Sequence, residues 1–506
     1  MPYADVQNLA LRRGLYFPTA EIYADAPAGF YEYGPEGTRI KQRLLQFWRK
    51  LLVENEGLHE IDGAVVLPEP VFRASGHLEN FADPLVNCTK CNTPYRADKL
   101  IEDALKTEIP EGASMEYFDS KIAELKLVCT KCKSPFGKTQ RFNMMMRTSV
   151  GAGNSVTAYL KPESCQNIFL NFSRIWKSGR VTLPFGIAQV GRTFRNEIAP
   201  RQGLLRLREL EQMDVEVFFN PQKINEIDRW DEVKDFPLNL YLLKDKEIHS
   251  ISCEDAVEQK IVSGRLIAYY LARMQQFAEA LNIPRETIRF RELEAEARAF
   301  YAHETWDFEV QLDEGWLELA ACNYRTDHDL KTHAETSKTE LQVKDEGTAE
   351  KFYPHVFELS MGVSRTFFAM LDATLQKETR GAEERWNLNL PIAVSPYHVG
   401  VFPLMKKDGL YEKAFGVFQQ LQAANISALF DEKGSIGKRY ARIDEIGVPY
   451  AITIDYETMD EKHANYNTVT LRDRNTMQQK RVPLEALEEV FWNFSTGKRS
   501  FEDLEE

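Results

Sequence analysis

Charged residues gather in two neighbouring segments near the middle of the chain. The first is Phe-Arg-Asn-Glu at 194–197, and after a gap of ten residues the second is Arg-Glu-Leu-Glu-Gln-Met-Asp-Val-Glu at 208–216. Their period-two spacing predicts two β-strands joined by a basic loop, with the charges on one face. Because arginine grips phosphate oxygens bidentately and a carboxylate accepts from an exocyclic amine, Arg195, Arg206 and Glu197 predict a purine nucleotide site. The alternative is an ordinary surface hairpin, since exposed pairs of opposite charge are common and contribute little to stability.

A second charged strand is predicted near residue 360. Glu358 and Ser360 lie two positions apart, so they share one face of this strand. Gly362 and Arg365 follow at the turn from the strand into a helix. The charged hairpin is therefore accompanied by a further carboxylate and a further arginine.

Two near-identical cysteine motifs precede the hairpin, Cys88-Thr-Lys-Cys91 and Cys129-Thr-Lys-Cys132. Together they supply the four thiolates of a tetrahedral structural zinc site. The 37 residues between the motifs include predicted helical stretches at 100–106 and 120–127. A metal-free pair of turns is the alternative, and no motif offers the open coordination position of a catalytic zinc.

Length, charge and composition limit the possible classes of protein. A chain of 506 residues is too long for one core and predicts roughly two to four domains. The net charge of −14 argues against a general affinity for nucleic acid but permits a local basic track. No apolar run is long enough for a membrane span, no secretory signal is evident, and the CxxC pairs suit a reducing compartment. We therefore expect no membrane association and a cytoplasmic location.

The predicted elements suggest a multidomain α/β protein. A long amphipathic helix is expected from Pro35 to about Asn55, followed by a Pro-ended strand at 63–68. Further strands are expected at 305–312, 316–320 and 355–360, the last leading into a helix near Val363. Residues 221–300 look like a helical insertion packed on the outside, and 376–391 look like a linker. From residue 392 onwards, strands alternating with helices predict a small, mainly parallel α/β domain.

The order of these features resembles the three signature motifs of class II aminoacyl-tRNA synthetases. More narrowly, it resembles the homodimeric glycyl-tRNA synthetase family. Strings similar to those of that family stand at 29–37, 75–77, 81–84, 95–98, 186–189, 194–197, 323–327 and 437–450. Several ordered strings that span residues 29 to 450 are more specific than any one of them.

The resemblance implies a fold and a domain order. The fold is a class II antiparallel sheet with flanking helices, an inserted zinc-knuckle region and a C-terminal anticodon-binding domain. Catalytic segments are implied at 1–84 (motif 1), 141–220 (motif 2) and 301–375 (motif 3). Between and after them lie the zinc knuckles at 85–140, the insertion at 221–300, the linker at 376–391 and the anticodon-binding domain at 392–506.

The resemblance also implies an activity. The enzyme would activate glycine with ATP and Mg²⁺, release pyrophosphate, and transfer glycine from the adenylate to the 3′-terminal ribose of tRNA(Gly). A structural Zn²⁺ would sit in the zinc-knuckle region. A homodimer would form through the helix and strand of residues 35–70.

Individual roles are implied by the matching positions. Arg195 and Arg206 would bind the α-phosphate, Glu197 the adenine amine and Arg365 the γ-phosphate, and the three arginines are the implied catalytic residues. Glu318 and Glu358 would contribute to Mg²⁺ and substrate contacts. The implied ATP-binding residues are Arg195, Asn196, Glu197, Leu205, Arg206, Leu210, Glu318, Leu319, Gly362 and Arg365. The implied substrate-binding residues are Arg96, Glu163, Leu210, Gln212, Asp214, Arg325, Glu358, Ser360 and Gly362, and the implied metal ligands are Cys88, Cys91, Cys129 and Cys132.

Departures from the family pattern cluster at the implied amino-acid pocket. The usual Arg-Pro-Glu-Thr-Ala-Gln-Gly appears as Lys161-Pro-Glu-Ser-Cys-Gln-Asn167, and Asp214, Leu210, Ala321 and Leu359 replace the usual Glu, aromatic residue, Gly and Pro. A class II ligase paralogue for another small amino acid is therefore an alternative. A non-catalytic nucleic-acid-binding subunit is a third, against which the retained phosphate-binding arginines argue.

Overall fold

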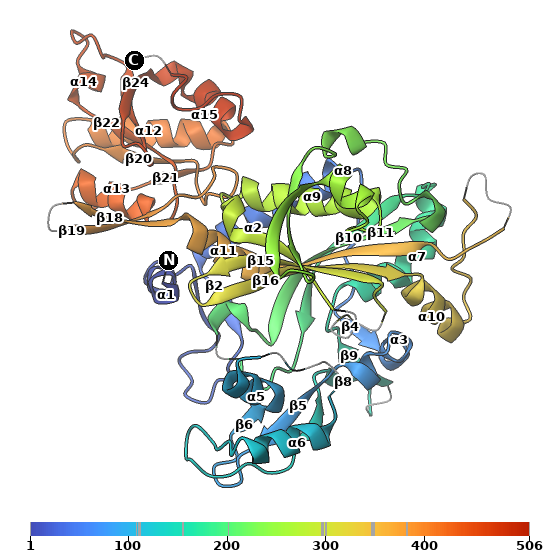
Figure 1. Ribbon diagram of the computed structural model, residues 1–506. Coiled ribbons are helices and arrows are strands. Elements are labelled where there is room, and N and C mark those ends of the chain that lie inside the picture. The colour runs from blue at the N-terminus through green and yellow to red at the C-terminus, as the bar shows by residue number, and fades with distance from the viewer. Residues whose placement is uncertain are drawn as a thin grey trace.

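A computed structural model describes residues 2–107, 109, 113–153, 156–200, 202–294, 298, 301–345, 350–380 and 383–504. Its centre is a nine-stranded sheet with the order β13-β12-β14-β15-β16-β17-β11-β10-β3 (Figure 1). All neighbours are antiparallel except β12 with β14 and β10 with β3. The strands are β3 (His59–Glu60), β10 (Phe185–Phe194), β11 (Glu209–Phe219), β12 (Pro237–Leu242), β13 (Glu247–Ser252), β14 (Ile288–Glu292), β15 (Glu304–Leu312), β16 (Gly315–Thr326) and β17 (His355–Gly362).

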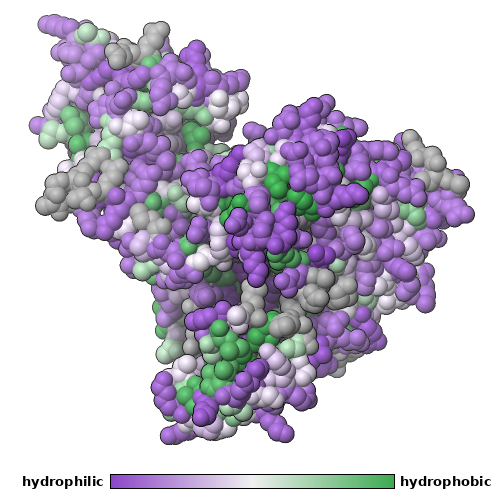
Figure 2. All heavy atoms as spheres, in the orientation of Figure 1, coloured by the Kyte–Doolittle hydropathy of each residue, from purple (hydrophilic) through white to green (hydrophobic). Residues whose placement is uncertain are grey.

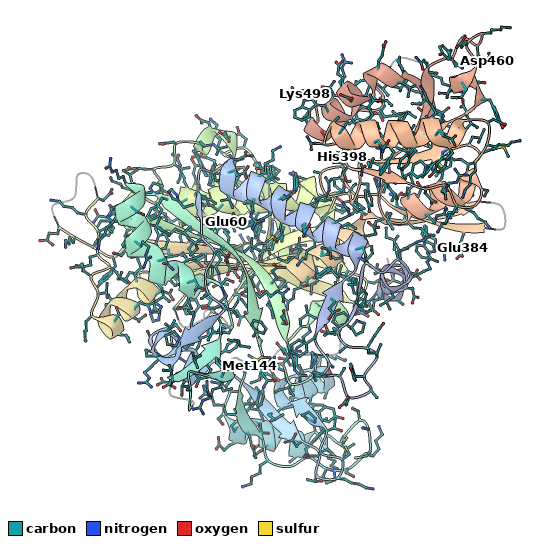
Figure 3. The ribbon with its side chains drawn as sticks, turned by 180° about the vertical axis from the view of Figure 1, so that it is seen from behind. Glu60, Met144, Glu384, His398, Asp460 and Lys498 are labelled. Atoms are coloured by element: carbon teal, nitrogen blue, oxygen red, sulfur yellow. The ribbon has the colours of Figure 1, made fainter. Side chains whose placement is uncertain are left out.

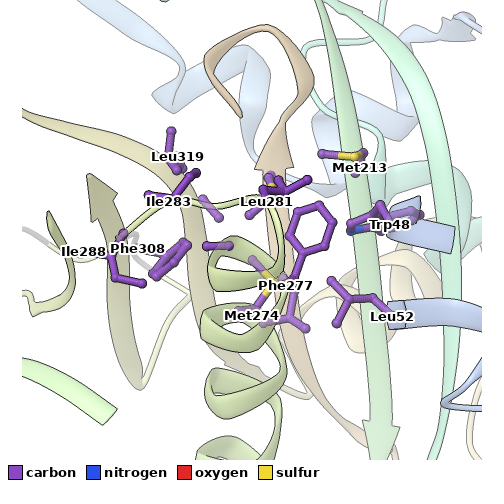
Figure 4. Packing of buried hydrophobic residues seen from close by; sticks show 14 of the residues in the cluster. Trp48, Leu52, Met213, Met274, Phe277, Leu281, Ile283, Ile288, Phe308 and Leu319 are labelled. Carbon is purple, nitrogen blue, oxygen red and sulfur yellow. The ribbon is translucent and has the colours of Figure 1, made fainter. Parts of the chain in front are cut away.

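One face of this sheet is buried under α2 (Pro35–Arg49), α9 (Arg265–Ala280) and α11 (Val363–Thr374). Pro35 begins α2, where its missing N–H costs no hydrogen bond, and the helix continues as a π-helical turn at Lys50–Glu54. Figure 3 shows α2 lying across the sheet, and Figure 4 shows Trp48 and Leu52 close to Phe277 of α9. The predicted long helix is therefore confirmed as a core element.

The opposite face carries α7 (Cys165–Gly179) and α10 (His328–Ser337), which pack on Phe185 and Phe218. Side chains alternate between the faces along each strand. On β11, Met213, Val215 and Val217 join the first core, whereas Gln212, Asp214 and Glu216 occupy the α7 face. The polar face predicted for this strand is thus present, and it lies beneath α7.

The cysteine motifs belong to a separate lobe below the sheet in Figure 1. It contains β5 (Ala82–Asn87), β6 (Pro94–Arg96), β7 (Gln140–Asn143), α5 (Ala97–Leu105) and α6 (Met115–Glu124), around a small core of its own. Figure 2 shows apolar surface on this lobe, whose exposed side chains include Leu105 and Val128. It is joined to the sheet by a layer of α3 (Glu69–Ala74), α4 (His77–Asn80) and the three-stranded sheet of β4 (Val66–Pro68), β9 (Val156–Leu160) and β8 (Met146–Val150).

The C-terminal domain has a five-stranded sheet of order β21-β20-β22-β23-β24. Its elements are β20 (Val399–Pro403), α12 (Leu410–Ala423), β21 (Ala428–Phe430), α13 (Ile436–Asp444), β22 (Tyr450–Ile454), α14 (Tyr456–Met459), β23 (Thr468–Asp473), β24 (Gln479–Pro483) and α15 (Leu487–Thr496). The first three strands are parallel, β23 is antiparallel to β22, and β24 is antiparallel to β23, so four of the five strands of this sheet run in one direction and β23 runs against them.

The prediction for residues 221–300 is wrong. Residues 221–300 are not an external helical insertion, because β12, β13 and β14 extend the central sheet and α9 lies in the main core beside α8 (Cys253–Glu258). Residues 376–391, predicted as a linker, contain an antiparallel hairpin of β18 (Leu375–Arg380) and β19 (Glu383–Leu388). The strand predicted at 63–68 is shorter than expected: it covers Val66–Pro68 as β4 and belongs to the small connecting sheet.

The N-terminal elements α1 (Tyr3–Arg12), β1 (Tyr16–Pro18) and β2 (Tyr31–Tyr33) lie between the central sheet and the C-terminal domain (Figure 1). Arg12 and Arg13 at the end of α1 both pair with Glu445, which follows α13. Arg43 of α2 hydrogen-bonds with His398 at 2.9 Å. Within the part of the chain that the structure describes, no helix is long and apolar enough to cross a membrane.

Candidate functional site

Strand register brings the predicted substrate residues into two rows on the α7 face. Gln189 of β10, Asp214 of β11, Ser360 of β17 and Ala321 of β16 stand opposite one another across the sheet. The next row contains Glu216, Glu358 and Asn323. The sheet therefore gathers three carboxylates from β11 and β17, two of which were predicted.

These side chains are tied together by hydrogen bonds. Ser360 donates to Asp214 Oδ1 at 2.7 Å and accepts from Gln212 Nε2 at 3.1 Å. Asn323 Nδ2 donates to Glu358 Oε2 at 2.6 Å. The hydroxyl and the amides thus fix the orientation of both carboxylates.

Arg325 lies behind this cluster and is only 1% exposed. Its guanidinium donates two hydrogen bonds to Asp329, at 2.8 and 2.9 Å, and a third to Glu358 Oε1 at 2.9 Å. It also stacks 3.9 Å from the ring centroid of Tyr301. Asp329 and Glu358 together neutralise the charge of Arg325. The guanidinium therefore holds the Glu358 carboxylate in place.

A fourth carboxylate, Glu163, lies two residues before the start of α7. Its Oε1 accepts from Gln166 Nε2 at 2.8 Å and from the Cys165 thiol at 3.0 Å, and lies 3.3 Å from His77 Nε2. His77 in turn hydrogen-bonds through Nδ1 to Ser75 at 2.8 Å. Burial opposes ionisation here, yet His77, with help from Arg325, holds the pKa of Glu163 well below its usual range.

The sheet carboxylates behave in the opposite way. Burial, reinforced by the neighbouring acids, raises the pKa of Asp214 to about 8 and that of Glu216 well above its usual range. Among the described residues, both oxygens of Glu216 and Oδ2 of Asp214 have no hydrogen-bond partner. Buried acceptors of this kind are costly unless a cation or a donor fills the space between them. The cluster therefore suits a small cationic group such as an ammonium.

The predicted nucleotide residues lie at the open end of the same strands. Arg195, Asn196, Glu197 and Arg206 are in the connection between β10 and β11, not on the strands as predicted. Arg206 donates to Glu197 Oε2 at 2.8 Å, and Arg195 Nε donates to the carbonyl of Pro162 at 3.1 Å. Within this connection Arg208 donates to the carbonyl of Glu197 at 2.8 Å.

Arg365 at the start of α11 faces the same open end. It donates to the backbone carbonyls of Leu205 and Glu318, at 3.2 and 2.8 Å, and lies 3.3 Å from Glu318 Oε2. Burial, followed by the nearby charge of Glu318, raises the pKa of Asp307 on β15 to about 7. Asp307 pairs with Arg291 at 2.9 Å, so Glu318 is the acid that lies beside Arg365.

Leu319, Leu210 and Arg96, which were also predicted to bind ATP or the amino acid, lie outside the two groups of side chains described above. The side chain of Leu319 lies in the apolar core on the opposite face of the sheet (Figure 4), whereas Leu210 is half-buried. Arg96 pairs with Asp98 and, at 2.8 Å, with Asp83. Burial raises the pKa of Asp83 to about 6, with Glu197 and Arg206 close enough to affect it, so the cysteine lobe borders the nucleotide residues.

The four motif cysteines converge within that lobe. Their sulfur atoms all lie within 4.8 Å of one another. In each motif the backbone N–H of the residue after the second cysteine closes the turn: Asn92 donates to the carbonyl of Cys88, and Lys133 donates to the carbonyl of Cys129. Four thiols in two such turns fit the ligand set of a tetrahedral zinc ion.

Comparison with known proteins shows the family to which this chain belongs. Residues 150–374 match the family model described as tRNA synthetase class II core domain (G, H, P, S and T), and 398–493 match the anticodon binding domain. The glycine–tRNA ligase of Methanothrix thermoacetophila is 36% identical over 99% of this chain and 98% of its own length. That of Pyrococcus furiosus is 35% identical over 96% of this chain and 97% of its own. The chain belongs to the glycine–tRNA ligase family.

A solved structure supports the fold. The chain described as the RNA binding domain of threonyl-tRNA synthetase from Cryptosporidium parvum superposes with a TM-score of 0.60 at 17% identity, covering 97% of this chain and 98% of that one. The predicted class II architecture with a C-terminal anticodon-binding domain is thus confirmed for this glycine–tRNA ligase family member.

Sequence reasoning missed three residues of the cluster. Glu216 continues the period-two series of Gln212 and Asp214, so alternation alone could have found it. Cys165 lies within the string at 161–167, where it had been noted only as a departure. His77 lies in the family-like string at 75–77, but its contact with Glu163 depends on the tertiary fold.

Proposed function

We propose that this protein attaches glycine to tRNA(Gly) with ATP, by way of glycyl-adenylate. The observation that carries the proposal is a buried cluster of carboxylates, two of them with oxygens open to a ligand, next to a row of arginines. An ammonium fits the first group of side chains and a triphosphate fits the second. This juxtaposition is what the activation of an amino acid requires.

The carboxylate cluster is the proposed amino-acid pocket. Glu163, Asp214, Glu216 and Glu358 would surround the ammonium, with Ser360 and Gln212 keeping Asp214 in position. Glycine offers no side chain to recognise, so selectivity depends on the space available beyond its α-carbon. Arg325 would act through Glu358 rather than by direct contact with the substrate.

The arginines at the open end are the proposed ATP site. Arg206 would exchange its bond to Glu197 for the α-phosphate, leaving Glu197 free to accept from the adenine amine. Arg195 would hold the same phosphate and Arg365 the far end of the triphosphate. Because the attacking carboxylate and the phosphate are both anionic, these arginines would act by positioning and by neutralising charge, with no protein nucleophile.

Two metals are proposed. Glu318, beside Arg365 at the nucleotide end, has the carboxylate chemistry to hold Mg²⁺, which would screen the phosphates of bound ATP. Cys88, Cys91, Cys129 and Cys132 would hold a structural Zn²⁺ and thereby fix the lobe that carries Arg96.

We also propose a homodimer. The sheet β4-β9-β8 carries Val66, Val150 and Val156 on one face, and these are 40%, 48% and 50% exposed. Exposed β-branched residues on one sheet face mark an interaction surface. A monomeric mass for the intact protein in light scattering, at micromolar concentration, would contradict this assignment.

Amino-acid-dependent exchange of ³²P between pyrophosphate and ATP tests the function. We expect exchange with glycine and much less with alanine or serine, and loss of exchange in Arg206→Ala. Exchange led by alanine or serine would instead identify a ligase for another small amino acid. No exchange with any of the three would favour a non-catalytic protein.

A further inference from the structure

Three hydrogen-bond donors converge over Gly191, in the second half of β10. A Cβ atom built on this glycine would lie 2.9 Å from Ser164 Oγ, 2.9 Å from Gln189 Nε2 and 3.1 Å from Lys161 Nζ. All three side chains are fully buried. Glycine at position 191 therefore leaves the space in which an ammonium, a hydroxyl and an amide approach the strand together.

These donors have capacity left for a ligand. Ser164 Oγ and both polar atoms of the Gln189 amide have no hydrogen-bond partner among the described residues. Lys161 Nζ donates to Asn167 Oδ1 at 2.9 Å and to the carbonyl of Gly63 at 3.5 Å, and an ammonium has a third N–H. Because buried polar groups are costly when they are left unpaired, the three side chains together suit an oxyanion.

The donors lie between the two halves of the proposed active site. Gln189 stands directly opposite Asp214 of the carboxylate cluster, and Gly191 is the next position on the same face of β10. Beyond the end of this strand is Arg195, which donates to the carbonyl of Pro162. In glycine the carboxylate carbon lies about 2.5 Å from the ammonium nitrogen. A carboxylate that must reach the phosphate from an ammonium at Asp214 therefore passes these donors.

We propose that Lys161, Ser164 and Gln189 hold the carboxylate of the amino acid, an inference that rests on the proposed function. One carboxylate oxygen accepts from these donors, and the other is left to attack the α-phosphate. Asn167 keeps the Lys161 ammonium in position. Burial lowers the pKa of Lys161 and the charge of Asp214 opposes this lowering, so a bound anion favours the charged ammonium further.

The test compares glycine with ethylamine, which keeps the ammonium and has a methyl group in place of the carboxylate. Ligand-observed NMR titration measures both affinities without turnover. Lys161→Met keeps the length of the side chain but not its charge, and we expect the affinity for glycine to fall roughly hundredfold. The affinity for ethylamine should stay the same or rise, because the variant removes a cation near the ammonium. Lys41→Met is the matched control, since Lys41 pairs with Glu211 at 2.8 Å on the other face of β11 and its loss should change neither affinity.

A second variant covers the case in which Lys161→Met does not fold. The hydroxyl of Ser164 has no partner among the described residues, so Ser164→Ala should keep its melting temperature while its affinity for glycine falls roughly tenfold. Equal losses for glycine and ethylamine, or an unchanged affinity for glycine in either folded variant, would overturn this inference alone. A raised KM for ATP with unchanged glycine affinity would assign the donors to the α-phosphate and overturn it as well. No binding of glycine to the unsubstituted protein would overturn the proposed function together with it.

Discussion

Binding of glycine should depend steeply on pH because of Asp214. Burial raises the pKa of this carboxyl to about 8, so it is largely protonated near neutrality when the pocket holds no ammonium. Only its ionised form attracts an ammonium strongly. The ionised fraction rises from about 1% at pH 6 to about 50% at pH 8, so the affinity for glycine should increase about fiftyfold over this range.

Isothermal titration of glycine measures this effect directly. At pH 6.5 binding should release close to one proton, which makes the observed enthalpy differ between phosphate and Tris buffers. The variant Asp214→Asn cannot ionise, so we expect it to bind glycine weakly and with a flatter pH profile. Equal affinity at pH 6 and pH 8, with no proton release, would refute an ammonium site at Asp214.

Three further predictions concern the other parts of the molecule. Arg206→Ala should lower kcat for pyrophosphate exchange roughly 10²- to 10³-fold, because it removes charge stabilisation at the phosphate; a fall below tenfold would show that the hairpin was misinterpreted. Asp329→Ala should lower the free energy of unfolding in urea by about 3–5 kcal/mol, because it leaves the buried Arg325 half-compensated; a loss under about 1 kcal/mol would contradict this compensation. Cys129→Ser should reduce the zinc content and the melting temperature together; full zinc content, by elemental analysis, would exclude a four-thiolate site.

Elements with strong alternation or broad apolar stripes could be predicted from the sequence. The strands β15 and β17 and the helices α2 and α11 were of this kind. The hairpin β18–β19 could not be predicted from the sequence, because its strands lack apolar alternation. Cross-strand contacts of Lys377 with Glu384 and Trp386 hold it instead. At 221–300, the short alternating series Leu238, Leu240 and Leu242 is a weaker signal than the long apolar stretch of α9.

Some residues of the candidate site could likewise be predicted from the sequence, and others could not. Asp214, Glu358 and Ser360 share strand faces, so alternation together with the family motifs located them. The contacts of Glu163 with His77 and of Arg325 with Asp329 and Glu358 depend on packing between elements, which no local pattern encodes. Likewise, the bond of Arg208 to the backbone carbonyl of Glu197 joins residues eleven apart in the chain.

The central claim is that this protein joins glycine to tRNA(Gly). The most direct measurement is the transfer of ¹⁴C-glycine to tRNA(Gly) transcript in the presence of ATP and Mg²⁺. We expect acid-precipitable label that depends on ATP, disappears on mild alkaline treatment as an ester should, and is absent with Arg206→Ala. No labelled tRNA from active, folded protein that does exchange pyrophosphate with glycine would contradict the account, because the adenylate would then serve another acceptor.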